Sequence, residues 1–166
     1  MSNDFEDFLE DDEAEGDADK FLLFDLGEES YGIPISNIIQ IVEMQPITHI
    51  PDMPNYVKGI INIRGQIIPT IDLRSRFHLP EKEADKKTCI VIISHESNSM
   101  GLIVDTVSEV RSIPKDDVAP APQVKNLSIN ERYILGLAKV GDEVKILLDI
   151  NKLFSEQDVQ AIANRI

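Results

Sequence analysis

Three histidines and one cysteine are the side chains in this sequence best suited to ligate a metal ion or act as a nucleophile. His49, His78 and His95 are scattered, with no pair at i, i+4 and no carboxylate at ligand spacing, so they form no recognisable metal motif. Cys89 begins the apolar run CIVII and has no basic neighbour that would lower its pKa, so we expect an inert thiol. A single cysteine cannot form an intramolecular disulfide, which is typical of a reduced, intracellular protein.

The sequence also lacks the motifs of common enzymes. Ser94 and His95 are adjacent, but neighbouring residues of a strand point to opposite faces of the sheet. The glycines form neither GxGxxG nor GxxxxGK[ST], and no serine stands in a GxSxG context. Aromatic residues make up 5% of the chain and include no tryptophan, so a stacking platform for bases or sugars is not expected. We therefore expect no catalytic residues, no cofactor and no metal.

Charge is concentrated at the N-terminus. The chain of 166 residues has 30 acidic and 16 basic residues, a net charge of −14. Ten of the acids and none of the bases lie in residues 1–19, which leaves 20 acids against 16 bases, or −4, in the remainder. Phosphate binding needs a basic surface, so nucleic acid is not an expected partner. We expect residues 1–19 to be a disordered, solvating tail, although DFEDFL within it could be a short docking motif.

The sequence has no signal that would place it in a membrane. No apolar run approaches the roughly 20 residues that a membrane span needs. The N-terminus is acidic instead of basic and then apolar, so no secretory signal is expected. These features predict a soluble, cytoplasmic protein without direct membrane insertion.

Short apolar runs separated by turn residues dominate the chain from Lys20 onward. Runs such as FLLFDL, IIPTIDL, CIVIIS and VKILLDI are typical of strands of about 4–8 residues. They predict an all-β protein built as small barrels or a sandwich. The end of the chain differs, because Ser155 and Asp158 form a capping-box pattern and are followed by apolar residues on one helical face. We expect a short C-terminal helix over residues 155–166.

The two halves of the chain resemble each other. Residues 21–42 align with 89–111 if the second turn has one extra residue, and residues 59–77 align with 136–154 without a gap. The alignment matches Gly32 with Gly101, Ile35 with Val104, Ile38 with Val107, Gln40 with Glu109, Ile41 with Val110, Gly59 with Gly136, Ile63 with Val140, Asp72 with Asp149 and Phe77 with Phe154. Each repeat is too small for a large core of its own, so we expect the two to pack together, with a groove between them.

This repeat predicts four segments. They are a disordered acidic tail (1–19), a first β-barrel subdomain (20–87), a second β-barrel subdomain (88–154) and the C-terminal helix (155–166).

Differences between the repeats point to positions that the fold does not dictate. Arg64 matches Gly141 in a hairpin turn, so the fold does not need a guanidinium there, and an interface role is as well supported as a plain surface turn. Pro69 matches Ile146, which predicts an edge or a non-bonded strand position. Asp72 and its match, by contrast, recur in both repeats and are interpreted as turn or cap residues.

The segment VKGIINIRGQIIPTIDLRSRF resembles the hallmark segment of the CheW family, the adaptor proteins of bacterial chemotaxis. In that family an Asn-Leu-Arg-Gly turn precedes an apolar strand that ends in Asp-Leu-Arg, and this chain has Asn62-Ile63-Arg64-Gly65. YGIPISNIIQIV, QPITHIPDMPNYVKG, GLIVDTVSEV and ILGLAKV…ILLDINKLF are similar to further family segments in the same order. The resemblance covers about residues 20–154.

This resemblance implies two tandem SH3-like five-stranded barrels and a non-catalytic role. It implies two partners: the helical cytoplasmic tip of a chemoreceptor, bound in the groove between the barrels, and the regulatory domain of a chemotaxis histidine kinase, bound at barrel ends. The receptor-binding residues implied are Ile38, Gln40, Ile41 and Arg64. Gln40 stands where the family commonly has glutamate. Because glutamine is neutral, an ion pair between positions 40 and 64 is not expected in this chain. Such an adaptor would be cytoplasmic and recruited to membrane-associated receptor arrays.

Two other functions remain open at this stage. The chain could be an adaptor of a related array with another output, such as twitching, or a double barrel that binds a small molecule between its domains. The second is less favoured because the groove candidates are mostly aliphatic.

Overall fold

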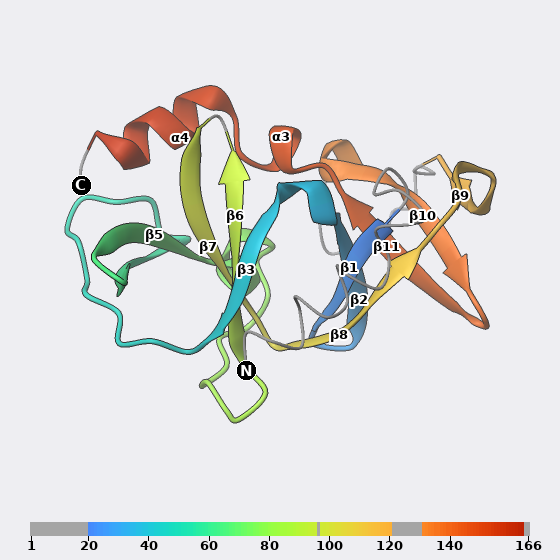
Figure 1. Ribbon diagram of the computed structural model, residues 1–166, viewed down its shortest axis with the longest axis horizontal. Coiled ribbons are helices and arrows are strands. Elements are labelled where there is room, and N and C mark those ends of the chain that lie inside the picture. Colours follow the sequence, from blue (N-terminus) through green and yellow to red (C-terminus); the bar gives the residue numbers. More distant parts are fainter. Residues whose placement is uncertain (1–19, 96, 121–130, 165–166) are drawn as a thin grey trace.

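The computed structural model describes residues 20–95, 97–120 and 131–164 (Figure 1). This part of the chain consists mostly of strands, as the sequence predicts. The strands are β1 (Lys20–Leu26), β2 (Glu29–Pro34), β3 (Ile38–Glu43), β4 (Val57–Ile63), β5 (Gln66–Asp72), β6 (Cys89–His95), β7 (Asn98–Val104), β8 (Thr106–Ser112), β9 (Val118–Ala119), β10 (Ile134–Val140) and β11 (Glu143–Leu148). The helices are α2 (Leu73–Arg76), α3 (Ile150–Leu153) and α4 (Glu156–Ala163), with 3₁₀ turns η2 (Ile35–Asn37), η3 (Lys115–Asp117) and η4 (Glu131–Tyr133). The expected acidic tail, residues 1–19, lies outside the described residues.

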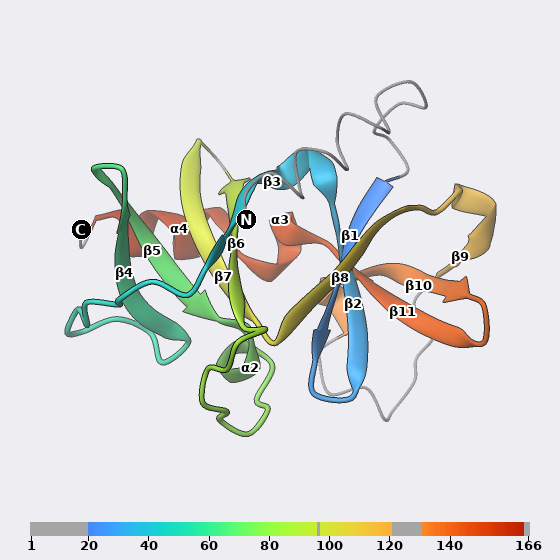
Figure 2. The ribbon, with the colours of Figure 1, turned by 60° about the horizontal axis from the view of Figure 1, so that its bottom comes forward.

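The strands form two sheets that lie side by side (Figure 2). The five-stranded sheet has the order β3-β6-β7-β5-β4, and the six-stranded sheet has the order β8-β1-β2-β11-β10-β9. The all-β class and the pair of packed β domains that the sequence predicts are therefore confirmed.

Each sheet combines strands of both sequence repeats. The hairpin β1–β2 belongs to the first repeat but pairs with β8 and β11 of the second. The hairpin β6–β7 belongs to the second repeat but pairs with β3 and β5 of the first. The expected division into residues 20–87 and 88–154 does not separate the two sheets, and we correct it: the repeats exchange their first hairpins.

Short links between strands explain this exchange. Only Asp105 lies between β7 and β8, whereas a tight hairpin needs two residues to reverse the chain. β8 therefore continues away from β7 and enters the six-stranded sheet. The three residues of η2, none of which has a positive φ, likewise carry the chain from β2 in one sheet to β3 in the other.

The repeat is visible in the pairing register. Gly32 of β2 faces Leu147 of β11, and Gly101 of β7 faces Thr70 of β5, both in parallel pairs. The sequence alignment matches these two glycines with each other, and residue 70 with residue 147. The two sheets are thus built on the same plan from matched strands.

Each sheet is closed by the segment that follows β3 or β8. Thr48 forms an antiparallel bridge to Ile60 of β4, and Ala119 of β9 pairs with Leu137 of β10 at the matched place. A glycine permits the close approach: a Cβ on Gly59 would lie 2.2 Å from the Thr48 carbonyl oxygen. The segment after β3 thereby reaches the outer strand β4, and β9, which follows β8, reaches β10, so each sheet curves toward closure as in a small barrel.

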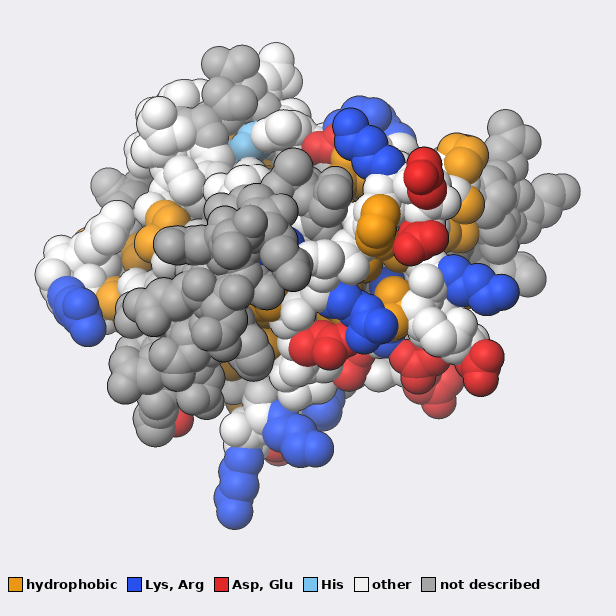
Figure 3. Space-filling view, turned by 45° about the vertical axis from the view of Figure 1, so that its right-hand side comes forward, with side chains coloured by type: hydrophobic (Ala, Val, Ile, Leu, Met, Phe, Trp, Pro, Cys, Tyr) orange, Lys and Arg blue, Asp and Glu red, His pale blue; other side chains and the backbone are white. Residues whose placement is uncertain are grey.

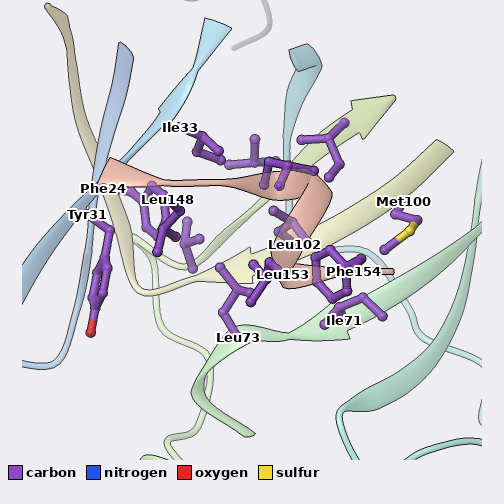
Figure 4. Close-up of a cluster of buried hydrophobic side chains, with 14 of the residues drawn as sticks. Phe24, Tyr31, Ile33, Ile71, Leu73, Met100, Leu102, Leu148, Leu153 and Phe154 are labelled. Atoms are coloured by element: carbon purple, nitrogen blue, oxygen red, sulfur yellow. The ribbon is translucent and has the colours of Figure 1, made fainter. Parts of the chain in front are cut away.

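The strands that read as continuous apolar runs are buried on both faces. Leu22 and Phe24 of β1 pack in the largest core cluster, whereas Phe21 and Leu23 pack in a separate cluster of the six-stranded sheet. The largest cluster lies between the sheets and takes side chains from both; Figure 4 labels Phe24, Tyr31, Ile33, Ile71, Leu73, Met100, Leu102, Leu148, Leu153 and Phe154. Because this core is shared, the two sheets fold as one unit.

The capping residues predicted from the sequence are confirmed. The side chain of Asp72 accepts a hydrogen bond from the Arg74 N–H at the start of α2, and Asp149 does the same for the start of α3. Ser155 and Asp158 form a reciprocal capping box at the start of α4, with hydrogen bonds of 3.1 and 3.2 Å.

No helix within the described ranges has the length and apolar character needed to cross a membrane.

Pro69 lies in β5, which is an interior strand and not an edge strand. The parallel pairing of β5 with β7 starts one residue later, at Thr70. In the other sheet the matched pairing starts earlier, at Lys145, one residue before Ile146, which is the match of Pro69. The proline thus shortens the parallel ladder, because it has no N–H to donate.

Candidate functional site

The turn between β4 and β5 consists of Arg64 and Gly65, both with positive φ, +52° and +88°. The N–H of Gly65 donates a hydrogen bond of 2.8 Å to the side-chain oxygen of Asn62, which stabilises the turn. Positive φ at both central residues is typical of the two-residue turns that suit the twist of a hairpin. The predicted hairpin loop is therefore confirmed.

Arg64 has a backbone conformation that glycine adopts more readily. A left-handed backbone costs a residue with a side chain roughly 1–2 kcal/mol. The matched residue, Gly141, has a φ of +63° and avoids this cost. Arg64 is exposed, and within the described residues its guanidinium makes no hydrogen bond or ion pair. Its donors are therefore available to a partner.

A hollow of about 330 Å³ lies beside this turn, between the turn and β3. Its lining residues are Gln40, Ile41, Val42, Glu43, Gln45, Ile63, Arg64 and Cys89. Three of the four residues predicted for the receptor groove, Gln40, Ile41 and Arg64, thus line one hollow, although Arg64 lies more than twenty positions after the other two in the sequence.

Ile38, the fourth predicted residue, does not line this hollow. It begins β3, pairs with Ile93 of β6 and packs partly against the core shared by the two sheets. The neighbouring Ile39 is 49% exposed. The apolar surface of β3 therefore extends from the hollow toward the junction of the two sheets.

The sequence reading missed several residues of the hollow. Glu43 could have been found, because it lies two positions after Ile41 and strand residues two apart share a face. Ile63 could also have been found, since it precedes Arg64 directly. Cys89 had no such signal: it reaches the hollow because it pairs with Glu43 across β3 and β6, a contact between distant segments.

The hollow is more polar than the sequence suggests. Beside its aliphatic side chains it contains Gln40, Glu43, Gln45 and Arg64. These groups offer amide, carboxylate and guanidinium hydrogen bonds around an apolar floor. The arrangement suits a partner surface that combines aliphatic side chains with directional polar contacts.

Cys89 belongs to the floor of the hollow and is half-buried. Burial raises the pKa of its thiol to about 11, since the thiolate loses hydration there. At neutral pH the residue is therefore a small apolar side chain instead of a nucleophile.

The three histidines lie apart in the structure. His49 and His78 are exposed, whereas His95 is buried and a ring N–H at Nε2 donates to the Phe154 carbonyl oxygen at 2.6 Å. Among the described residues, no group of three or more His, Cys, Asp or Glu side chains could hold a metal ion.

Residues 20–158, which span both sheets, match the family model described as a CheW-like domain. The chain belongs to the CheW-like family. A chemotaxis protein CheW of Treponema pallidum (strain Nichols) is 40% identical over 149 residues, which cover 87% of each chain. A chemotaxis protein CheW of Klebsiella aerogenes is 34% identical over 145 residues, again 87% of each chain.

A solved structure agrees with this assignment. The crystal structure of the scaffolding protein TtCheW from Thermoanaerobacter tengcongensis matches with a TM-score of 0.76 at 36% sequence identity. The match covers 84% of this chain and 90% of that chain. The two structures therefore share a fold over most of this CheW-like chain.

Proposed function

We propose that this CheW-like chain is a non-catalytic adaptor, which couples the cytoplasmic tips of chemoreceptors to a chemotaxis histidine kinase and controls the activity of that kinase. The observation that carries this proposal is the family match over residues 20–158, together with relatives named chemotaxis and scaffolding proteins. Such an adaptor is cytoplasmic and is recruited to receptor arrays at the membrane. It transmits a signal by holding the kinase in a fixed position relative to the receptor. A change in the receptor then slightly shifts the equilibrium between two kinase states.

The receptor tip, a helix, binds along β3 and the Arg64 turn. The aliphatic side chains of Ile38 and Ile41 provide apolar anchorage, and Gln40 borders the same hollow as Arg64. The guanidinium of Arg64 supplies directional hydrogen bonds at the edge of the groove. Its strained backbone supports this role, because a fold requirement alone would favour glycine there.

The kinase binds at the end of the six-stranded sheet, near the turn between β10 and β11. Val144 is 56% exposed there, beside a hollow of about 400 Å³ that is also lined by Leu137, Ile146, Glu28 and Glu143. This side of the molecule presents small hydrophobic patches among acidic and basic side chains (Figure 3). An exposed aliphatic centre with a charged rim is the usual composition of an interface.

The matched place in the five-stranded sheet is partly covered by the chain itself. Ile67, the match of Val144, lines a hollow together with Val159 and Ile162 of α4. The six-stranded sheet has no such helix over its own hollow in the described residues. This asymmetry favours the Val144 surface over the Ile67 surface for a large partner.

Co-sedimentation tests the proposal most directly. The chain is mixed with a receptor cytoplasmic fragment assembled on vesicles and with the histidine kinase, and the pellet is assayed for kinase activity. We expect all three proteins in the pellet and a kinase activity that depends on the chain. The proposal fails if the chain binds neither protein.

Two further measurements separate the alternatives. An adaptor of a related array would bind a different kinase and receptor set, so the kinase that co-purifies with the chain identifies the output. A ligand screen by thermal shift addresses small-molecule binding, for which the polar groups of the hollow are the specific reason. A tight ligand found without any protein partner would favour that function.

A further inference from the structure

The short helix α2 carries two arginines that contact segments leading into or out of strands of the opposite sheet. It follows β5 of the five-stranded sheet directly. Arg74 and Arg76 extend from it in two directions, toward the link between β7 and β8 and toward the segment around η4 and α3. α2 is thus placed at the seam between the two sheets.

Arg74 makes a two-point ion pair with Asp105. Its Nε and Nη2 donate to the two carboxylate oxygens at 2.8 and 2.6 Å, and its Nη1 donates to the Pro80 carbonyl oxygen at 2.8 Å. Asp105 also accepts a hydrogen bond of 2.8 Å from the N–H of Gly27, in the β1–β2 turn of the six-stranded sheet. Both charged side chains are only 13–14% exposed, so water screens the pair weakly.

Asp105 is well placed to transmit orientation. It is the single residue between β7 in one sheet and β8 in the other. Burial alone would raise the pKa of its carboxyl, but the hydrogen bonds from Arg74 and Gly27 outweigh burial and hold the pKa below its ordinary value. The carboxylate therefore stays charged at neutral pH and keeps all these contacts.

Arg76 holds the seam at a second point. Its Nη2 donates to the Tyr133 hydroxyl at 3.1 Å and to the Leu153 carbonyl oxygen at 2.9 Å. Its guanidinium lies between two rings, 5.0 Å from the centre of Tyr56 and 4.9 Å from the centre of Tyr133. These tyrosines are matched residues of the two repeats, so Arg76 lies where the repeats meet.

The second repeat has no such pair of arginines. The residues matched to Arg74 and Arg76 are Asn151 and Leu153, and the residue matched to Asp105 is Ser36. Leu153 is fully buried, which shows that the fold accepts an apolar side chain at this position. Arg76 instead buries an Nε that has no hydrogen-bond partner within the described residues, at a free-energy cost that leucine avoids.

We propose that α2 is a clamp whose arginines fix the orientation of the two sheets, with Arg74 and Asp105 as its principal positioning pair. The clamp itself follows from the fold and needs no partner protein. Its consequence for signalling rests on the proposed function, because the proposed receptor site around Arg64 belongs to the five-stranded sheet and the proposed kinase site around Val144 belongs to the six-stranded sheet. The clamp therefore sets the angle between the receptor and kinase surfaces.

Distances between spin labels test the clamp without any partner protein. The labels are attached at Lys58→Cys on β4 and Lys139→Cys on β10, two exposed positions in different sheets. Cys89, the single native cysteine, is replaced by alanine in every protein of the series, so that only the two introduced thiols carry labels. Arg74→Gln is compared with the matched control Arg111→Gln, which breaks an exposed pair of 3.1 Å with Glu109 on the single strand β8.

We expect Arg74→Gln to broaden or shift the distribution of label distances, and Arg111→Gln to leave it unchanged. An unchanged distribution in Arg74→Gln overturns the clamp. If that variant does not fold, Asp105→Asn takes its place with the same two outcomes, because asparagine keeps the size of the side chain and one acceptor. Arg74→Lys, which keeps the charge but not the two-point geometry, should give a smaller change than Arg74→Gln.

A kinase assay with the same variants tests the consequence for signalling. We expect Arg74→Gln to bind receptor fragment and kinase as the parent does, while receptor control of the kinase falls at least about fivefold. A broadened distance distribution with normal control would overturn the signalling role and leave the clamp. Failure of the parent chain to bind either partner would instead overturn the proposed function, since the distance measurement does not involve partners.

Discussion

Arg64 and Gly141 occupy matched places in the two repeats and share a left-handed backbone, with φ of +52° and +63°. Glycine adopts this conformation without strain, and arginine does not. The exposed turn gives no structural reason for the arginine, because its guanidinium makes no hydrogen bond or ion pair within the described residues. The hairpin requires only the left-handed backbone that both turns share, so the arginine side chain at position 64 is assigned to the proposed receptor surface.

Arg64→Gly should leave the fold intact while weakening receptor binding. Relief of backbone strain is partly offset by the greater entropy of glycine in the unfolded chain, so we expect stability to be unchanged or higher by up to about 1 kcal/mol. Loss of an interface arginine should weaken binding by roughly 1–2 kcal/mol or more. Thermal unfolding and titration of receptor fragment measure the two effects.

Arg64→Ala, which keeps the backbone strain, should show the same loss of binding with little change in melting temperature. Normal receptor binding by both variants would contradict the site assignment.

Val144→Asp should weaken binding of the kinase regulatory domain but not of the receptor. The side chain is 56% exposed, so the variant should unfold at about the same temperature as the parent. The new carboxylate would lie beside Glu143 and would remove the apolar centre of the proposed kinase surface. Affinity measurements with each partner alone give the comparison, and Arg64→Gly is the reciprocal control. Loss of both partners in Val144→Asp would mean that the two surfaces are not separate.

Asp105 should stabilise the fold at neutral pH and lose this effect in acid. Its folded-state pKa lies below the ordinary value of 3.8, so its contribution is fully present above that value and declines as the pH falls through the folded-state pKa. At pH 7 we expect Asp105→Asn to be less stable than the parent by about 1–3 kcal/mol, as for hydrogen bonds to a charged group. Urea unfolding of both proteins at pH 7 and at stepwise lower pH should show the two converging below pH about 4. A constant difference at every pH would show that ionisation of this carboxyl is not involved.

Cys89 should react slowly with alkylating reagents in the native protein. With a pKa of about 11, about one thiol in ten thousand is ionised at pH 7. We expect alkylation in native buffer to be far slower than in urea, where the thiol regains an ordinary pKa near 8.5. Mass spectrometry of time points in both conditions measures the rates. Equal rates would mean that the floor of the hollow is open to the reagent and does not raise the pKa of the thiol.

Gly59→Ala should be strongly destabilising because it blocks closure of the five-stranded sheet. The new methyl group would lie 2.2 Å from the Thr48 carbonyl oxygen, a backbone atom that cannot move without breaking the bridge to Ile60. We expect a loss of more than about 2 kcal/mol, measured by urea unfolding. Gly65→Ala is the matched control, since its φ is also positive but its methyl group would meet nothing within 4 Å. Comparable losses in the two variants would assign the effect to backbone strain alone.

Local chemistry allowed much of this protein to be predicted from its sequence. The strands follow from short apolar runs and turn residues, and the helix caps at Asp72, Asp149 and Ser155 follow from the types of residues at helix starts. The repeat, the unusual position of Arg64 and the family resemblance are also properties of the sequence. All of them depend on residues that are near in the chain, or on a comparison of the chain with itself or with the pattern of a known family.

The tertiary structure alone decided which strands share a sheet and which side chains meet. The hairpin exchange depends on pairing between distant strands. The link between β7 and β8 is only one residue long, Asp105, which is too short for β8 to turn back beside β7. Cys89 joins the hollow of Arg64 only through the pairing of β6 with β3. Arg74 reaches Asp105 across 31 positions of the chain. Such contacts carry no local periodicity, because the free energy of packing and pairing, and not the preference of any one segment, selects them.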